Sequence, residues 1–336
     1  MNTVILGISK EDIELAASLI KKGEVVGIPT ETVYGLAADA MNEEAVKKIF
    51  AAKGRPADNP LIVHISNFDM VYDIASEIPS LAHELAKKFW PGPLTMIMPK
   101  SDKIPDVTSG GLDTVGIRFP SHPVAQALIN ASHKPLAAPS ANLSGSPSPT
   151  NCARVYEDMR GRIPAIIDGG ESDVGVESTV ISFEGDGIRI LRPGKISVED
   201  FLTVTDKVYI DNGVLAQLDA NVVAKSPGMK YKHYSPKANI ILVDSDIEAF
   251  KKYVNDNKCE NTYCLLFDES EAVDGVGYLT YGVTSEEQAH YLFERLREFD
   301  EMGAKTVYAR CPSKDGVGLA VYNRILRSAG FNLVKL

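Results

Sequence analysis

Apolar and polar positions alternate in two distinct patterns along the first two hundred residues. Segments 10–22, 43–53, 80–90 and 123–132 are predicted to be helices, because apolar positions are combined there with residues that begin or end a helix. Between these segments, short apolar runs predict buried strands at 25–28, 61–65, 94–98, 115–119 and 136–138. This alternation of helices and strands indicates an α/β domain.

The end of this region has a different pattern. Thr150 is predicted to cap a further helix, and strands are expected at 165–167, 178–183 and 187–191. The last two strands are close enough in sequence to form a hairpin. We therefore expect a mixed sheet.

The pattern loosens after about residue 206. Segment 224–236, AKSPGMKYKHYSP, is polar, aromatic and bounded by proline, which is typical of a connector. Beyond it, apolar runs at 240–243, 263–267 and 306–309 alternate with helical segments that end at 257 or span 285–302 and 316–328. We predict a first domain at 1–206, a connector at 207–237 and a smaller, open, Rossmann-like α/β domain at 238–336.

Length and charge narrow the class of protein. The chain has 336 residues and so exceeds the roughly 250–300 residues at which single cores stop growing. Acidic residues outnumber basic ones by 45 to 35, which gives a net charge of −10, so an anion site would need a local cluster of cations. The four cysteines are widely spaced, and we find neither a signal-peptide pattern nor a membrane-length apolar run. We expect a cytoplasmic protein with reduced thiols.

One cluster of cations surrounds the turn KGRPADNPLIVHI at 53–65. Lys53 and Arg55 flank a glycine that is predicted to end a helix, so both can extend past the helix end towards phosphate oxygens. Asn59 and His64 follow nearby. Lys53 alone could merely compensate the helix dipole, an effect worth about 0.3–1 kcal/mol. His64 could equally be a hydrogen-bonded core residue.

Further candidates lie at the ends of predicted strands. The segments PTETVYGL from Pro29 and PSANLSGSPSPT from Pro139 offer hydroxyl and backbone N–H groups, although the first alone is better explained by an ordinary turn. Arg118 lies inside an apolar strand, where a buried cation must pair with an internal carboxylate or await an external one. Arg192, like Arg55, precedes a proline. Together these cations suggest a focused positive cavity, although no familiar phosphate loop is present.

The motifs as a set resemble one family. They are PTETVYGL from Pro29, KGRP from Lys53 with NPL from Asn59, WPGPLT from Trp90, SANLSG from Ser140, STV from Ser178 and LRPG from Leu191. In this order they look like the YrdC-like fold of threonylcarbamoyl-AMP synthases. SPGMKYKHYSP from Ser226 resembles the linker of the family's long, two-domain form. The resemblance covers about residues 5–236, and the rest fits the second domain by length and pattern only.

The resemblance implies a fold and an activity. The fold would be a twisted mixed sheet with helices around a positively charged cavity. The enzyme, an ATP-binding nucleotidyltransferase, would convert L-threonine, bicarbonate or CO2, and ATP to threonylcarbamoyl-AMP and pyrophosphate. Another complex would then transfer the group to tRNA, to form threonylcarbamoyl-adenosine next to the anticodon. Mg²⁺ would bind mainly through the phosphates, with no organic cofactor, and neither a membrane nor tightly bound nucleic acid would be a partner.

The same resemblance assigns residues to the two substrates. Those of the L-threonine pocket would be Thr30, His64, Arg118, Ala138 (through its backbone) and Ser178. Those that hold ATP or pyrophosphate would be Lys53, Arg55, Asn59, Thr114, Ser140, Asn142, Ser148 and Arg192. No general base is assigned, with His64 as a candidate. Lys230, Tyr231 and Tyr234 of the connector are interpreted as a lid that excludes water from a labile anhydride, with a passive tether as the alternative.

Two other functions remain open from the sequence. An RNA-binding, translation-associated protein would use the same cations, but a net charge of −10 disfavours a broad surface that tracks phosphates. A maturation factor for carbamoyl chemistry shares the fold, but the cysteine spacing and length of its additional regions are missing here. The oligomeric state and any ligand of the second domain are not predicted.

Overall fold

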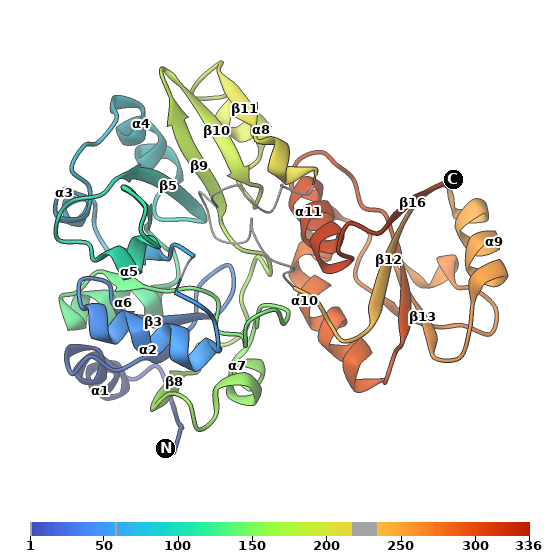
Figure 1. Ribbon diagram of the computed structural model, residues 1–336, viewed down its shortest axis with the longest axis horizontal. Helices are drawn as coiled ribbons and strands as arrows, with labels where there is room; N and C mark the ends of the chain where they lie inside the picture. Colours follow the sequence, from blue (N-terminus) through green and yellow to red (C-terminus); the bar gives the residue numbers. More distant parts are fainter. Residues whose placement is uncertain (1, 58, 217–233) are drawn as a thin grey trace.

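Two sheets organise the chain, one of eleven strands and one of five (Figure 1). A computed structural model describes residues 2–57, 59–216 and 234–336. The expected lid residues Lys230 and Tyr231 therefore lie outside the described residues. No helix in the described part of the chain is long and apolar enough to cross a membrane.

The larger sheet is mixed, as the sequence pattern predicts. β9 (Thr179–Glu184) and β10 (Gly187–Arg192) form the predicted antiparallel hairpin. Two other pairs are parallel: β4 (Ile62–His64) with β6 (Thr114–Arg118), and β5 (Leu94–Pro99) with β9. β11 begins just past the expected domain boundary at 206 and pairs with β10. In order across the sheet, the strands are β1 (Val4–Leu6), β8 (Ala165–Ile167), β2 (Val26–Ile28), β3 (Gly35–Asp39), β7 (Leu136–Ala137), β4 (Ile62–His64), β6 (Thr114–Arg118), β5 (Leu94–Pro99), β9 (Thr179–Glu184), β10 (Gly187–Arg192) and β11 (Val208–Ile210).

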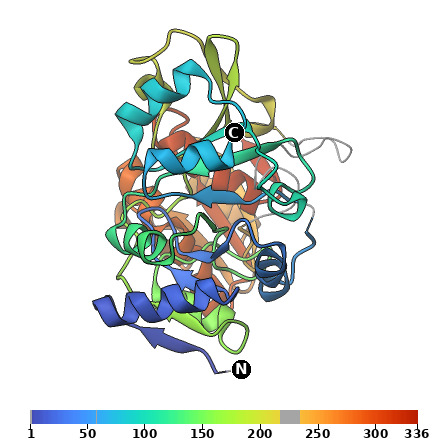
Figure 2. The same ribbon diagram turned by 90° about the vertical axis from the view of Figure 1, so that its left-hand side faces the viewer.

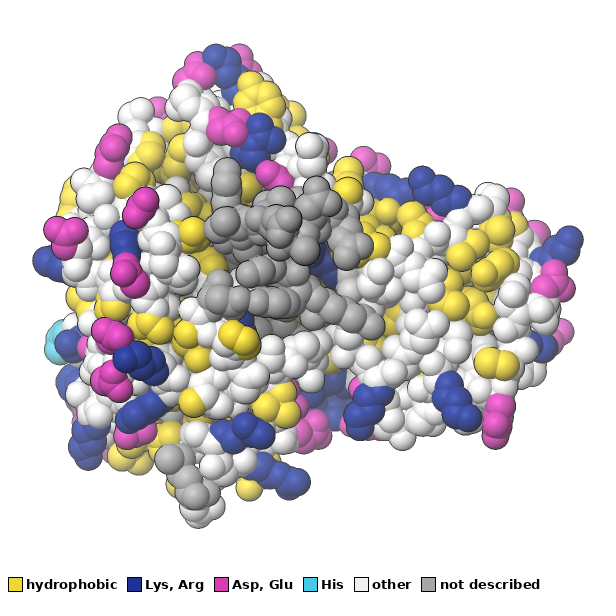
Figure 3. Space-filling view, in the orientation of Figure 1, with side chains coloured by type: hydrophobic (Ala, Val, Ile, Leu, Met, Phe, Trp, Pro, Cys, Tyr) yellow, Lys and Arg dark blue, Asp and Glu magenta, His cyan; other side chains and the backbone are white. Residues whose placement is uncertain are grey.

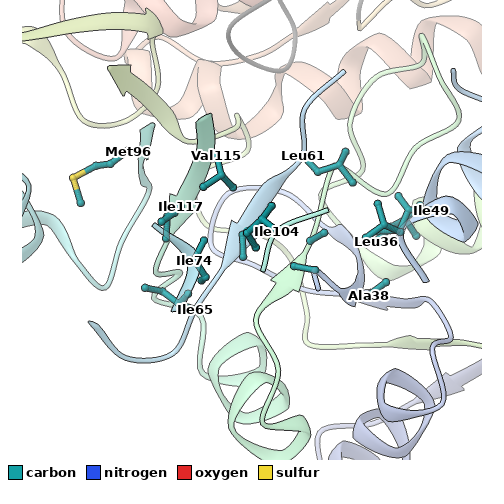
Figure 4. Packing of buried hydrophobic residues seen from close by; sticks show 14 of the residues in the cluster. Leu36, Ala38, Ile49, Leu61, Ile65, Ile74, Met96, Ile104, Val115 and Ile117 are labelled. Atoms are coloured by element: carbon teal, nitrogen blue, oxygen red, sulfur yellow. The ribbon is translucent and has the colours of Figure 1, made fainter. Parts of the chain in front are cut away.

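Helices cover both faces of this sheet. Successive residues of a strand point to opposite faces, so one strand contributes side chains to the cores on both sides. Leu36 and Ala38 of β3 belong to one core, part of which is shown in Figure 4, and Ala37 between them belongs to the other. The first core is covered by α2 (Glu43–Lys53), α4 (Ser80–Phe89) and α7 (Cys152–Met159). The second is covered by α1 (Lys10–Lys21) and α6 (Pro123–Ser132). Three short helices complete the domain: α3 (Val71–Ile74), α5 (Asp106–Ser109) and α8 (Val198–Phe201).

Capping residues explain where the helices begin and end. Asn42 accepts a hydrogen bond from the third residue of α2, and Gly54 ends the helix in the left-handed conformation, with φ 62°. The prediction that Thr150 caps a helix is wrong by one residue. Asn151 caps α7 by accepting from Arg154 N at 3.0 Å, while the carbonyl of Thr150 accepts from Ser172 N, which ties it to a neighbouring loop.

The smaller sheet is entirely parallel, with the order β14 (Gly277–Thr280), β13 (Thr262–Leu266), β15 (Thr306–Arg310), β12 (Asn239–Asp244) and β16 (Leu333–Lys335). Its helices are α9 (Ile247–Asn257), α10 (Ser285–Glu301) and α11 (Gly318–Ser328). The predicted open α/β fold is therefore confirmed, with β14 and β16 as strands that the sequence pattern did not indicate.

The two sheets are joined by a shared hydrophobic core. α10 and α11 lie on the side of the smaller sheet that faces the first domain, and α9 lies on the far side (Figure 1). Their core continues into Val33, Val174 and Val176 of the first domain. Figure 2, seen from the side of the first domain, places β1 and α1 near the N-terminus at one end of the larger sheet.

Candidate active site

A cavity opens where segments 29–36, 53–55, 138–146 and 177–192 meet. Together with its solvent-open mouth it encloses about 770 Å³. The predicted substrate residues that line it are Thr30, Lys53, Arg55, His64, Arg118, Ala138, Ser140, Asn142, Ser178 and Arg192, and Tyr234 of the expected lid lines it as well. Four cations from three separate segments of the chain thus converge on one cavity.

Lys53 is held at one side of the cavity by backbone oxygens. It is the last residue of α2, and its Nζ donates to the carbonyls of Ser140 at 2.5 Å and Asn142 at 2.8 Å. Burial, and then the charge of Arg55, lower the pKa of Lys53 to about 7. The ammonium form of Lys53 therefore becomes more stable when an anion enters beside it.

Arg192 fixes the opposite wall. Its Nε donates to Ser178 O and its Nη2 to Ser178 Oγ, both at 3.1 Å. Ser178 Oγ is in turn 2.8 Å from Thr95 Oγ1 on β5. These contacts join the end of β10 to the start of β9 and leave a buried guanidinium at the cavity surface.

Arg118 already has an internal carboxylate partner. Its Nη2 lies 2.8 Å from Glu31 Oε2, and its Nη1 donates to Thr32 Oγ1 at 2.9 Å. Both charged side chains are nearly inaccessible, with Arg118 4% and Glu31 5% exposed. Burial raises the pKa of Glu31, but the charge and hydrogen bond of Arg118 and backbone hydrogen bonds together outweigh burial and hold the pKa below its usual value. Of the two possibilities left open by the sequence, the structure shows the internal pair.

His64 lines the cavity as a neutral imidazole. It lies beside Arg118 because β4 and β6 pair in parallel, with these two residues in register. Its Nδ1 is 3.2 Å from Ile62 O. Burial, and then the charge of Arg118, lower the pKa of His64 to about 3, so that the ring is a poor proton acceptor in this state.

The two loops with hydroxyl groups are packed side by side. Ala138 N donates to Ile62 O at 3.0 Å, which holds its backbone at the cavity, and Ala141 N donates to Tyr34 O at 2.8 Å. A side chain at Gly35 would meet Ala138 Cβ at 3.3 Å. The sequence PTETVYGL is therefore more than a turn, since Gly35 begins β3 and pairs with Ser140, and Thr30 lines the same cavity.

Three predicted ATP residues are not among the lining residues. Asn59 is fully buried, and its amide has no hydrogen-bond partner among the described residues. Thr114 borders a separate small hollow beside Ile62 and Thr95. Ser148 lies behind the wall, where its Oγ donates to Glu177 Oε1 at 2.5 Å.

Sequence reasoning missed three buried charges at the site, namely Glu31, Glu177 and Arg324. Glu31 could have been found, because it lies inside the motif PTETVYGL and the buried Arg118 requires an acid. Glu177 similarly adjoins Ser178. Arg324 gives no such signal, because an arginine in an amphipathic helix is ordinarily solvent-exposed.

Charge elsewhere on the molecule is mixed. Figure 3 shows basic and acidic side chains interspersed over the visible face of both domains. Among the described residues, no group of three or more histidines, cysteines or acids could hold a metal ion. The concentration of cations at the cavity therefore contrasts with the face seen in Figure 3.

Known proteins similar to this chain cover nearly its full length. A family model described as "Telomere recombination" matches residues 18–194, and one described as "Threonylcarbamoyl-AMP synthase, C-terminal domain" matches 196–330. Threonylcarbamoyl-AMP synthase of Pyrococcus abyssi is 45% identical over 96% of each chain, and that of Bacillus subtilis 42% identical over 98% of this chain and 96% of its own. The crystal structure of P. abyssi Sua5 complexed with L-threonine has a TM-score of 0.92 and 43% identity, covering 99% of this chain and all of that one.

Proposed function

The chain belongs to the threonylcarbamoyl-AMP synthase family, and we propose that its cavity forms threonylcarbamoyl-AMP and pyrophosphate from ATP, L-threonine and bicarbonate. The observation that carries this proposal is the convergence of Lys53, Arg55, Arg118 and Arg192 on one cavity of an otherwise acidic protein. Such a cavity neutralises a triphosphate beside an amino acid carboxylate. The protein is accordingly a nucleotidyltransferase that serves tRNA modification.

Threonine binds on the Arg118 side of the cavity. The guanidinium offers a planar fork to the threonine carboxylate, which takes the place of Glu31 or shares the cation with it. Thr30, His64, Ser178 and the backbone of Ala138 complete the pocket. This assignment is supported by the burial of Arg118, because a buried cation with an unsatisfied Nε attracts an external anion.

ATP binds on the side of Lys53, Arg55 and Arg192. The hydroxyl and amide of Ser140 and Asn142 lie in the same wall. Asn59, Thr114 and Ser148 belong to the surroundings of this site, and their contact with ATP requires a change of shape on binding. Mg²⁺ would enter with the nucleotide and be held mainly by its phosphates and water.

The chemistry needs positioning more than a reactive side chain. The threonine ammonium group gives up its protons to water or a phosphate oxygen as the amine captures CO2 as a carbamate. A carbamate oxygen then forms a bond to the α-phosphorus while the bond to pyrophosphate breaks. Lys53, Arg55 and Arg192 stabilise the charge that moves onto pyrophosphate. Because burial and the charge of Arg118 lower the pKa of His64 to about 3, His64 positions the substrate and is not expected to take the proton from the amine.

The same proposal assigns roles to the two domains and a destination to the product. The first domain, to about residue 206, holds the chemistry, and residues 238–336 form the second domain, with a connector between them. Tyr234 forms part of the cavity wall, where it stacks on Phe293 with ring centroids 5.1 Å apart. The product passes to a tRNA-transfer complex in the cytoplasm. An RNA-binding role is less well supported, because the cations lie inside a cavity rather than along a surface.

Pyrophosphate release from ATP tests the proposal directly. Release should require both threonine and bicarbonate, and the second product should have the mass of threonylcarbamoyl-AMP. Serine and valine serve as matched controls, since each preserves only part of the threonine side chain. Release that continues unchanged without threonine would refute the proposed function.

A further inference from the structure

Glu177 introduces a negative charge into the wall of the cavity. The other charged lining residues in the described part of the chain are Lys53, Arg55, Arg118 and Arg192, together with the titratable His64. Glu177 is only 7% exposed, so water screens it poorly. A fixed carboxylate there opposes a polyphosphate, because like charges repel strongly where solvent is excluded. The binding of ATP therefore requires that this charge be offset.

An arginine from the second domain offsets it. Arg324 of α11 donates from Nε to Glu177 Oε2 at 2.8 Å, while Ser148 donates to Oε1 at 2.5 Å. Arg324 is fully buried. Burial raises the pKa of Glu177, but the charges of Arg324 and then Arg192 outweigh it, so the carboxyl stays ionised.

The guanidinium of Arg324 has other contacts besides its pair with Glu177. Its Nη1 donates to Asn323 Oδ1 at 2.8 Å. Its Cζ lies 5.6 Å from the ring centroid of Tyr234, which lines the cavity. Its Nη2 is buried without a hydrogen-bond partner among the described residues. Burial lowers the pKa of Arg192, and the nearby charge of Arg324 adds to that effect. Arg324 therefore belongs to the charge balance of the cavity.

We propose that Arg324 is a positioning residue for ATP, which holds the Glu177 carboxylate against Ser148 and cancels its charge so that Lys53 and Arg192 remain available to the phosphates. The inference rests on the proposed function and gives the second domain a part in the reaction. The alternative is a purely structural link between domains. Arg154 of α7 provides such a link, because it pairs with Glu294 of α10 at 2.6 Å and is not among the lining residues of the cavity.

Five variants separate the two roles: Arg324→Met, Arg324→Lys, Glu177→Gln, the double variant Arg324→Met/Glu177→Gln, and Arg154→Met as the control. Calorimetry with ATP alone measures nucleotide binding, and pyrophosphate release measures both KM values. We expect Arg324→Met to weaken ATP binding about tenfold or more, since one partner of a buried charge pair is lost. The KM for threonine should change by less than about twofold.

The remaining variants test the charge argument. Arg324→Lys should fall between wild type and Arg324→Met, because lysine keeps the charge without the planar fork. Glu177→Gln should bind ATP at least as tightly as wild type, and the double variant should regain most of the loss. Arg154→Met should lower thermal stability and leave both KM values unchanged.

Several results would overturn the inference. They are wild-type ATP affinity in Arg324→Met, an equal rise of both KM values, a double variant no better than the single one, or weaker ATP binding in Glu177→Gln. If Arg324→Met fails to fold, the ATP affinities and KM values of Arg324→Lys and the double variant test the inference instead. If the wild-type protein binds ATP but releases no pyrophosphate with threonine, the proposed function is wrong. The ATP titrations would still test whether Arg324 supports nucleotide binding.

Discussion

Three of the four cations that line the cavity are held by partners from another segment of the chain. Lys53 donates to backbone oxygens of the loop after β7, Arg118 pairs with Glu31, and Arg192 donates to Ser178. Because these contacts fix the side chains, the charges are held where phosphate and carboxylate would enter. Such preorganisation saves the free energy of reorganising the site during the reaction.

The Arg118 contacts predict a selective loss of threonine use. Arg118→Ala should raise the KM for threonine by about a hundredfold, as expected for a truncated buried charge pair, and the KM for ATP by less than about threefold. Pyrophosphate release measures both. Because Glu31 would be left buried and unpaired, Arg118→Ala/Glu31→Gln is the matched control, which should recover stability without recovering threonine affinity. Equal effects on both substrates would contradict the assigned pocket.

The Lys53 environment predicts a pH dependence of ATP binding. Because burial and the charge of Arg55 lower the pKa of Lys53 to about 7, this side chain is mainly neutral at pH 8, and bound phosphates stabilise its charged form. ATP affinity should therefore fall as pH rises through 7, and binding at pH 8 should take up a proton. Calorimetry in two buffers of different ionisation enthalpy measures this uptake. It should vanish in Lys53→Met; the same uptake in that variant would assign the proton to another group.

The types of these residues could be predicted from sequence, but their pairings could not. Lys53 and Arg55 were identified because they flank a helix-ending glycine, and Arg118 because a cation in an apolar strand needs a partner. The partners depend on register and on packing between domains. His64 meets Arg118 only through the pairing of β4 with β6, and Arg324 reaches Glu177 only through the docking of α11.

At the scale of elements, the site depends on close backbone contacts between strands and loops. Gly194, which follows β10, packs against the residues just before β9 so tightly that a Cβ there would lie 2.4 Å from Thr179 N and 2.7 Å from Ser178 C. Helices such as α6 could be predicted to the residue because caps and periodicity are local signals. The sequence pattern did not predict β1 or β3. Glycine, alanine and aspartate, which are depleted in strands, make up four of the five residues of β3.

The close contact at Gly194 predicts a variant that damages both the site and the fold. Gly194→Ala should displace the backbone of Ser178 and Glu177, and so reduce kcat/KM by about tenfold or more as well as stability. The control is Gly185→Ala in the β9–β10 turn. There φ is 58° with no atom near the added Cβ, so only about 1–2 kcal/mol of conformational strain is expected. Steady-state kinetics and denaturant unfolding measure the two effects; unchanged kinetics in Gly194→Ala would contradict the prediction.

At the scale of the whole molecule, the two domains share their core and their charge pairs. Val33, Val174 and Val176 pack into the hydrophobic cluster of the second domain. Arg297 of α10 pairs with Asp158 of α7 at 2.8 Å, in addition to the pairs of Arg154 and Arg324. The length and pattern of the chain predict two domains, but they do not predict how large the interface between them is. Exposed apolar residues and interfacial ones look alike in sequence.

The shared core predicts that the domains unfold together. Differential scanning calorimetry should show one transition for the full chain, and ATP should shift the whole transition upward, by about 2.7 kcal/mol of stability at a hundredfold excess over Kd. Val176→Ala, which leaves a gap in the joint core, should lower the same single transition. Two separate transitions, of which ATP moves only one, would show that the domains are energetically independent.

The distance in sequence between Glu177 and Arg324 also sets an order of events during synthesis. The two residues are 147 positions apart, so a ribosome adding about 5–20 residues per second makes the arginine roughly 7–30 seconds after the glutamate. Through that interval the first domain lacks both the counterion of Glu177 and the second domain's part of the shared core. The emerging chain would bind nucleotide poorly, and full competence would arrive only when α11 has been translated and has docked.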